Sequence, residues 1–219
     1  MLLEAALVIA ALVGALLTRP WRMLASAPPL ADGSRHASPL STPLLASLVV
    51  LPWMWALPTL HAMPLQLQWS GACLVTLMLG WPLAVPVLLL VAALAWTISP
   101  GLDAADALGA AAWLGVVPAT LALGLGAAVR RTIGTKPFVY VLGRGFLGTV
   151  VCVFAAGVLS QWAGHQLPGV GDNLSLVARW LMAWGDGFVT GMLTAIFVAF
   201  KPEWLATWSD QLYLPRPPA

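Results

Sequence analysis

Residues Gln68–Ser99, which read QWSGACLVTLMLGWPLAVPVLLLVAALAWTIS, decide the fold of this chain. The stretch is almost entirely apolar, and it is longer than the roughly 20 residues that one helix needs to cross a bilayer. It is interrupted by Gly80-Trp81-Pro82, and glycine close to proline is a strong local breaker of helices. The stretch therefore crosses a membrane either once, as a bent helix, or twice, with a tight turn at Gly80-Trp81-Pro82.

The charges of the neighbouring loops favour the double crossing, because short cytoplasmic loops collect lysine and arginine. A double crossing gathers the basic loop residues on one side of the membrane and the acidic loop residues on the other. The basic residues are Arg19, Arg22, Arg35, Arg130, Arg131, Lys136, Lys201 and Arg216, and the acidic ones are Asp103, Asp106 and Asp172. We therefore expect an all-α bundle of about seven transmembrane helices, or six if the stretch crosses once. The N-terminus is expected outside the cytoplasm and the C-terminus inside.

Two crossings of about 16 residues each are short for a bilayer about 30 Å thick. Backbone that is not helical is tolerated at membrane depth only where protein surrounds it or where it lines a cavity. We therefore expect one or both segments to be partly re-entrant and shielded by neighbouring helices.

The composition of the whole chain is that of an integral membrane protein. Of its 219 residues, 60% are hydrophobic and only 8% are charged, against roughly 25% charged residues in soluble domains. We expect a single membrane domain over residues 1–219, with a cytoplasmic loop at 19–44 and a cytoplasmic tail at 201–219. A formal net charge of +2 is too small to indicate nucleic-acid binding. Besides the central stretch, the apolar regions are about Leu3–Leu17, Leu45–Leu60, Ala105–Val129, Phe138–Trp162 and Leu176–Phe200.

An acidic residue, Asp186, lies near the middle of the last apolar region, in the sequence Trp184-Gly185-Asp186-Gly187-Phe188. A charged side chain at bilayer depth costs roughly 2.5–3.5 kcal/mol on insertion scales, so such residues usually face a bundle interior or a cavity. Asp186 is therefore either a hydrogen-bonded residue that helps helices pack or a carboxylate of a binding site or pathway. Gly187 and Gly191 beside it have the spacing that predicts close contact between helix backbones.

Three further polar residues, His61, Gln68 and Thr190, are candidates to join Asp186 in a metal site. Carboxylate, imidazole and amide groups can together hold a divalent transition ion. A lone His61 beside Met63 and Pro64 also fits an ordinary interfacial histidine. The sequence has no glycine-rich phosphate loop, no paired Cys or His at metal-ligand spacing and no serine-based nucleophile elbow. These absences predict binding and translocation rather than catalysis.

Several motifs resemble a proteobacterial group of CbiM-like membrane proteins, which are similar to the substrate-capture component of energy-coupling-factor ABC transporters. The resemblance implies a seven-helix capture subunit in the bacterial inner membrane that binds cobalt or nickel as its substrate. It also implies a separate transmembrane coupling protein and ATPase subunits as partners. The motifs are Gly71–Ala84 (GACLVTLMLGWPLA), Arg130-Arg131, Phe138-Val139-Tyr140, Asp186–Met192 (DGFVTGM) and Lys201–Thr207 (KPEWLAT).

Two other classes of function stay open at this point. CbiM proper carries a histidine directly after the initiator methionine, where this chain has Leu2. The first alternative is therefore a structural or assembly subunit of a larger membrane complex that has lost the metal site. The second is a membrane enzyme that uses Asp186 as a general base. In the uptake hypothesis, membrane lipid surrounds the bundle, and the small residues of the first helix and the Arg130-Arg131 region face the protein partner.

Overall fold

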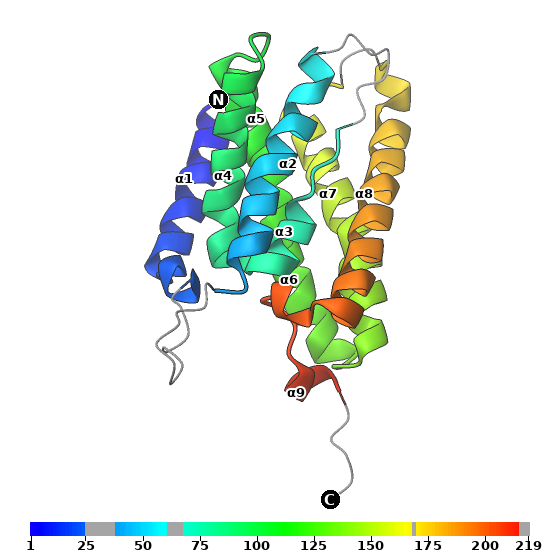
Figure 1. Ribbon diagram of the computed structural model, residues 1–219. Helices are drawn as coiled ribbons and strands as arrows, with labels where there is room; N and C mark the ends of the chain where they lie inside the picture. Colours follow the sequence, from blue (N-terminus) through cyan, green and yellow to red (C-terminus); the bar gives the residue numbers. More distant parts are fainter. Residues whose placement is uncertain (25–37, 61–67, 168–169, 215–219) are drawn as a thin grey trace, which may run out of the picture.

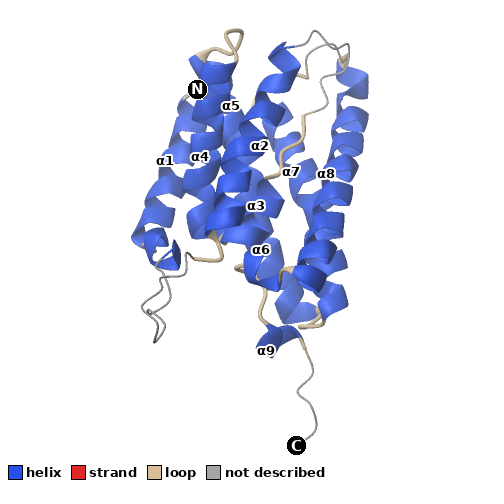
Figure 2. Cartoon of the chain, viewed as in Figure 1, coloured by secondary structure: helices blue, strands red, loops and turns tan. Residues whose placement is uncertain are grey.

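The computed structural model describes residues 1–24, 38–60, 68–167 and 170–214, and every regular element in these ranges is a helix (Figure 2). Within these ranges five helices are long and apolar enough to cross a membrane, so the chain is a multi-pass membrane protein. These spans are α2 (Ser41–Leu60), α4 (Trp81–Ile98), the continuous helix Ala104–Thr132, the continuous helix Val139–Trp162, and residues Leu174–Phe200 of α8 (Asp172–Phe200). The remaining longer helix is α1 (Leu2–Leu17).

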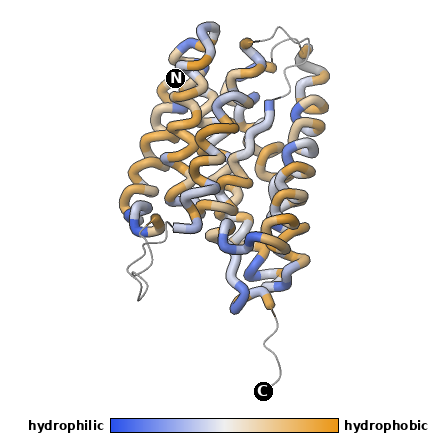
Figure 3. The backbone as a smooth tube through the Cα atoms, viewed as in Figure 1, coloured by the Kyte–Doolittle hydropathy of each residue, from blue (hydrophilic) through white to orange (hydrophobic). Residues whose placement is uncertain are grey.

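The helices run side by side between two ends of the bundle (Figure 1). The upper end in that view carries the N-terminus and the loops that follow α4 and α7, and the lower end carries the C-terminal segments. Long apolar stretches follow the helices between the two ends (Figure 3). Large apolar side chains on the outside, such as Ile9, Val49, Leu90 and Phe188, are exposed, and they provide the surface that faces lipid.

The decisive stretch Gln68–Ser99 contains two helices, not one. The first, α3 (Ala72–Leu79), is separated from α4 by Gly80, whose φ of 75° and ψ of 151° lie in a region open essentially to glycine alone. Because of this turn the chain reverses direction, and α4 runs back toward the upper end (Figure 1). The break at Gly80 is thus where the sequence predicts it.

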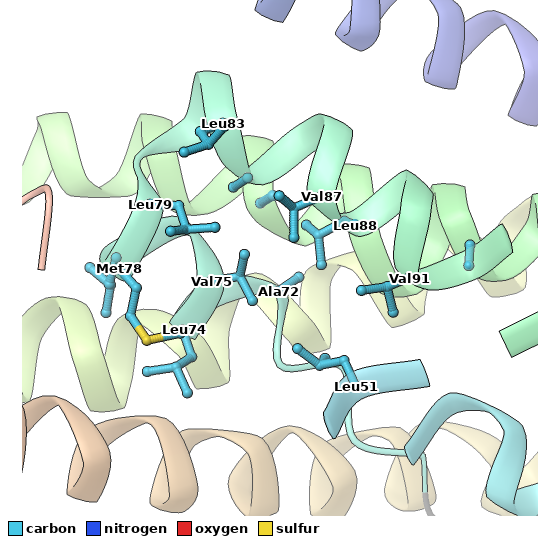
Figure 4. Close-up of a cluster of buried hydrophobic side chains, with 14 of the residues drawn as sticks. Leu51, Ala72, Leu74, Val75, Met78, Leu79, Leu83, Val87, Leu88 and Val91 are labelled. Atoms are coloured by element: carbon cyan, nitrogen blue, oxygen red, sulfur yellow. The ribbon is translucent and has the colours of Figure 1, made fainter. Parts of the chain in front are cut away.

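Helix α3 lies inside the bundle, and all eight of its residues are buried. The segment that leads into it, from Gln68 to Gly71, is not helical. Leu74, Val75 and Leu79 of α3 pack in the main apolar cluster with Leu88 of α4 and Leu51 of α2 (Figure 4). Since lipid is as apolar as these side chains, van der Waals packing holds them together. The expected shielding of a short segment by neighbouring helices agrees with this burial.

Two of the spans contain π-helical turns. One is built from α5 (Ala104–Ala110), the π-helical η2 (Ala111–Val116) and α6 (Val117–Thr132). The other begins with the π-helical η3 (Val139–Leu147) and continues as α7 (Gly148–Trp162). Such turns leave backbone groups in irregular positions and are frequent at functional sites.

Helix α8 packs closely on this last span, as Gly187 and Gly191 predict. A Cβ atom at Gly191 would lie 2.9 Å from Cβ of Phe146, and one at Gly187 would overlap Cγ2 of Val150. Only glycine permits this approach, so the predicted close contact beside Asp186 is confirmed.

Short elements at the lower end correspond to the expected loop and tail. Residues Pro20–Leu24 form a 3₁₀ turn, η1, and α2 begins at Ser41, so the ends of the expected loop 19–44 are helical and residues 25–37 lie outside the described ranges. The tail forms a 3₁₀ turn, η4 (Pro202–Trp204), and a short helix, α9 (Asp210–Tyr213).

Candidate binding cavity and discontinuous helix

Asp186 holds the N-terminal end of the buried helix α3. The backbone N–H of Ser70 donates to Oδ2 of Asp186 at 2.8 Å, and the N–H of Gly71 donates to Oδ1 at 3.3 Å. The carboxylate is 2% exposed and comes from a helix far along the chain. The first N–H groups of a helix lack partners within it, and they attract negative charge. Asp186 therefore supplies the acceptors that water would supply at the end of an exposed helix.

The other polar groups around the start of α3 are also paired. The indole Nε1–H of the buried Trp55 donates to the carbonyl oxygen of Ser70 at 3.1 Å. The hydroxyl of Ser70 donates to the carbonyl oxygen of Leu114 in the π-helical η2 at 2.6 Å. The non-helical segment is thus tied to α2, η2 and α8 at once.

The C-terminal tail satisfies the other end of α3. The N–H of Ala206 donates to the carbonyl oxygen of Met78 at 2.9 Å, and the hydroxyl of Thr207 donates to that of Leu77 at 2.9 Å. Leu77 and Met78 belong to the last turn of α3. The carbonyl oxygens of a last helical turn have no hydrogen-bond donors within the helix. The Lys201–Thr207 motif therefore has a defined structural role, which is to close the lower end of the buried helix.

A cavity of about 350 Å³ lies above this segment, toward the upper end of the bundle. Gln68 and Ser70 form one part of its wall, and Trp55 and Trp113 provide aromatic surface. Its volume falls in the range of small-molecule sites, which are roughly 300–1,000 Å³. The discontinuous segment, by which we mean the non-helical residues Gln68–Gly71 before α3, thus lies between the cavity and the carboxylate of Asp186.

The four residues selected from the sequence have different positions. Gln68 lines the cavity, whereas Asp186 lies behind Ser70 and does not line it. Thr190 lies one helical turn below Asp186 and is completely buried, and its hydroxyl has no hydrogen-bond partner among the described residues. His61 lies outside the described residues. Gln68 thus faces the cavity, and Asp186 lies on the opposite side of the Gln68–Gly71 segment.

Two cavity residues, His165 and Arg179, were not among the candidates. Nε2 of His165 lies 2.7 Å from Oε1 of the buried Glu4 in α1. The carbonyl oxygen of His165 accepts a hydrogen bond from Nη2 of Arg179 at 2.7 Å. Arg179 lies two helical turns before Asp186 in the same apolar region. The helical period therefore places the two residues on the same face of one helix, and this spacing could have identified Arg179 from the sequence. His165 lies in the loop before α8, and no local pattern marks it.

No cluster of three or more His, Cys, Asp or Glu side chains that could hold a metal ion occurs within the described part of the chain. The two cysteines, Cys73 and Cys152, are both buried and free. A metal ion in the cavity would therefore need amide, hydroxyl or ligand-derived oxygen donors in addition to single protein groups.

No family model, curated protein or solved structure matches the chain.

Proposed function

We propose that the protein is the membrane-embedded capture component of an uptake system for a cobalt- or nickel-type metal ion, of the CbiM-like kind. It binds and translocates its substrate and does not catalyse a reaction. The observation that carries the proposal is the cavity at the upper end, whose wall includes the non-helical segment before the buried helix α3, which a buried carboxylate holds. Transporters commonly build their sites where a broken helix leaves backbone groups facing a cavity.

In this proposal the substrate enters the cavity from outside the cell and meets Gln68 in the wall. Asp186 and Thr190 lie further along the inner face of α8, and they are the pathway groups below the discontinuous segment. His61, the fourth proposed metal-site residue, precedes Gln68 in the chain. Movement of the substrate past Ser70 would require Asp186 to release the N–H groups that it now holds.

The proposed membrane is the bacterial inner membrane, which the chain crosses seven times. The lower end contains η1 with Arg22, and the last turn of α6 with Arg130 and Arg131. Positive loops favour the cytoplasm, so we place the lower end inside and the N-terminus outside. The cytoplasmic ATPases and the transmembrane coupling protein would contact the exposed Arg130-Arg131 region, and the coupling protein would also meet the exposed Ala6 and Ala10 of α1.

One observation favours a second candidate function. Both oxygens of Asp186 accept backbone hydrogen bonds, so the carboxylate has a complete structural role without any ion. A structural or assembly subunit of a larger membrane complex would keep Asp186 for this reason alone.

Metal accumulation by cells that carry the whole uptake system tests the proposal. Gln68→Ala changes the cavity wall at a residue that makes no hydrogen bond to the described residues, so the fold should survive. We expect it to lower cobalt or nickel accumulation strongly while the amount of inserted protein stays the same. Unchanged accumulation, together with stable co-purification with a large redox complex, would favour the second candidate.

A further inference from the structure

We infer that the cavity at the upper end binds a small organic carboxylate through Arg179, an inference about substrate class that rests on the proposed function and refines it. The carboxylate is either the free anion or the chelator that carries the metal ion.

The Arg179 side chain crosses from α8 to the wall of the cavity. Its stem lies against Gly157 of α7, where an added Cβ atom would be 3.3 Å from Cδ of Arg179. The guanidinium is anchored at one end, where Nη2 donates to the carbonyl oxygen of His165. Both contacts hold the guanidinium at the cavity wall, because Gly157 makes the room and the loop after α7 supplies the acceptor.

The positive charge of Arg179 has no acidic partner within the described residues. The ion pairs in that part of the chain join Glu4 to Met1 and His165, and Lys201 to Glu203. Arg144 near the lower end has no acidic partner among the described residues either, but it donates to the hydroxyl of Tyr213 and lies over the ring of Tyr140, whereas Arg179 has only a carbonyl oxygen. An unpaired charge inside a membrane protein is costly, so it marks a place where a ligand of opposite charge binds.

The chemistry of the guanidinium selects a carboxylate. It carries five N–H donors and no acceptor, and Nη1 of Arg179 makes no hydrogen bond to the described residues. The planar fork of donors matches the two oxygens of a carboxylate. Trp55 and Trp113 add apolar surface to the wall of the same cavity, and apolar surface beside an ion pair strengthens it.

The other charged groups near the cavity leave this preference in place. Asp106 in the first turn of α5 also lines the cavity, but it is exposed, so water screens its charge, and it forms no ion pair with Arg179. Nε2 of His165 faces Glu4, and this carboxylate does not line the cavity. A bare divalent cation in the same space would be repelled by Arg179.

Titration calorimetry on the full chain in lipid nanodiscs tests the inference with three probes: citrate, nickel citrate and Ni²⁺ alone. We expect citrate, nickel citrate or both to bind, and Arg179→Gln to weaken that binding by about tenfold or more. Arg131→Gln at the lower end is the matched control and should leave binding unchanged. Gln68→Glu adds a carboxylate to the wall without touching Arg179, so it tests the sign of the site if Arg179→Gln fails to fold. If the cavity binds anions, the added negative charge of Gln68→Glu should weaken the binding of citrate or nickel citrate. If the cavity binds cations, the same charge should strengthen the binding of Ni²⁺.

The outcomes separate this inference from the proposed function. Binding of Ni²⁺ alone, strengthened by Gln68→Glu, would overturn the carboxylate site and leave metal capture standing. Binding of citrate without any form of nickel would support the site and contradict metal capture. Carboxylate binding that Arg179→Gln and Gln68→Glu leave unchanged, or wild-type protein that binds none of the three probes, would overturn the inference.

Discussion

Asp186 and Arg179 lie two helical turns apart on α8, and the surroundings of their charges differ completely. Asp186 is enclosed by backbone N–H donors, so its charge is compensated within the fold. Among the described residues Arg179 makes one hydrogen bond, to a carbonyl oxygen, at the wall of a cavity. A compensated charge indicates a structural role, and an uncompensated charge indicates binding. This difference is why Arg179 is the stronger candidate for direct contact with a ligand.

Replacing Asp186 with Asn should destabilise the protein, because Ser70 and Gly71 donate to different oxygens of the carboxylate, and the amide nitrogen that replaces one of them donates and does not accept. Each hydrogen bond to a charged group is worth roughly 1.5–3 kcal/mol, so we expect a clear fall in the midpoint of thermal unfolding in detergent. Thr190→Val is the matched control, since it is nearly isosteric, equally buried and removes a hydroxyl that has no partner in the described part of the chain. It should leave the midpoint unchanged or raise it. Equal midpoints for Asp186→Asn and the wild type would contradict the anchoring role.

At the scale of elements, α3 is a short helix whose two ends are both closed by residues distant in sequence. Asp186 supplies acceptors at its start, and Ala206 and Thr207 supply donors at its end. A fully buried helix needs such partners, because no water reaches its terminal N–H and C=O groups. The tail segment that contains Ala206 and Thr207 is thus part of the same structural unit as the buried helix.

The packing of α8 on α7 and η3 depends on Gly187 and gives a paired test. Gly187→Ala brings a methyl group into Val150 and near the carbonyl oxygen of Phe146, and overpacking of this kind typically costs about 1–3 kcal/mol. Gly185→Ala has open space around its Cβ and improves helix propensity, so it should be neutral or stabilising. Thermal unfolding of the two variants side by side measures the difference. A Gly187→Ala protein as stable as Gly185→Ala would show that the close approach is not required.

Gly80 and Gln68 show which features of the fold can be predicted from the sequence and which cannot. The break at Gly80 follows from the backbone preferences of glycine and proline, which act locally, and the close contact at Gly187 follows from side-chain size. The non-helical course of Gln68–Gly71 and its pairing with Asp186 depend on contacts across more than 100 residues, which local patterns do not encode. The sequence could have identified Arg179 as a site residue from its two-turn spacing to Asp186. It could not have predicted that His165 lies beside Glu4.

At the scale of the whole molecule, the orientation in the membrane is a separate testable claim. A membrane-impermeant maleimide applied to intact spheroplasts should label Asp103→Cys in the upper loop. It should label Lys136→Cys in the lower loop only after the membrane is opened. The native Cys73 and Cys152 are both buried and should react little. Labelling of Lys136→Cys in intact spheroplasts would reverse the proposed orientation.

The cavity, the discontinuous segment and the buried carboxylate are the features on which the proposed binding and translocation function rests. The most direct test is the metal content of purified wild-type protein and Gln68→Ala, each equilibrated with cobalt or nickel in the presence of citrate and then washed. We predict a stoichiometric amount of metal in the wild type and strongly reduced metal in Gln68→Ala at equal thermal stability. A folded wild-type protein that retains no metal under these conditions would contradict the proposed function.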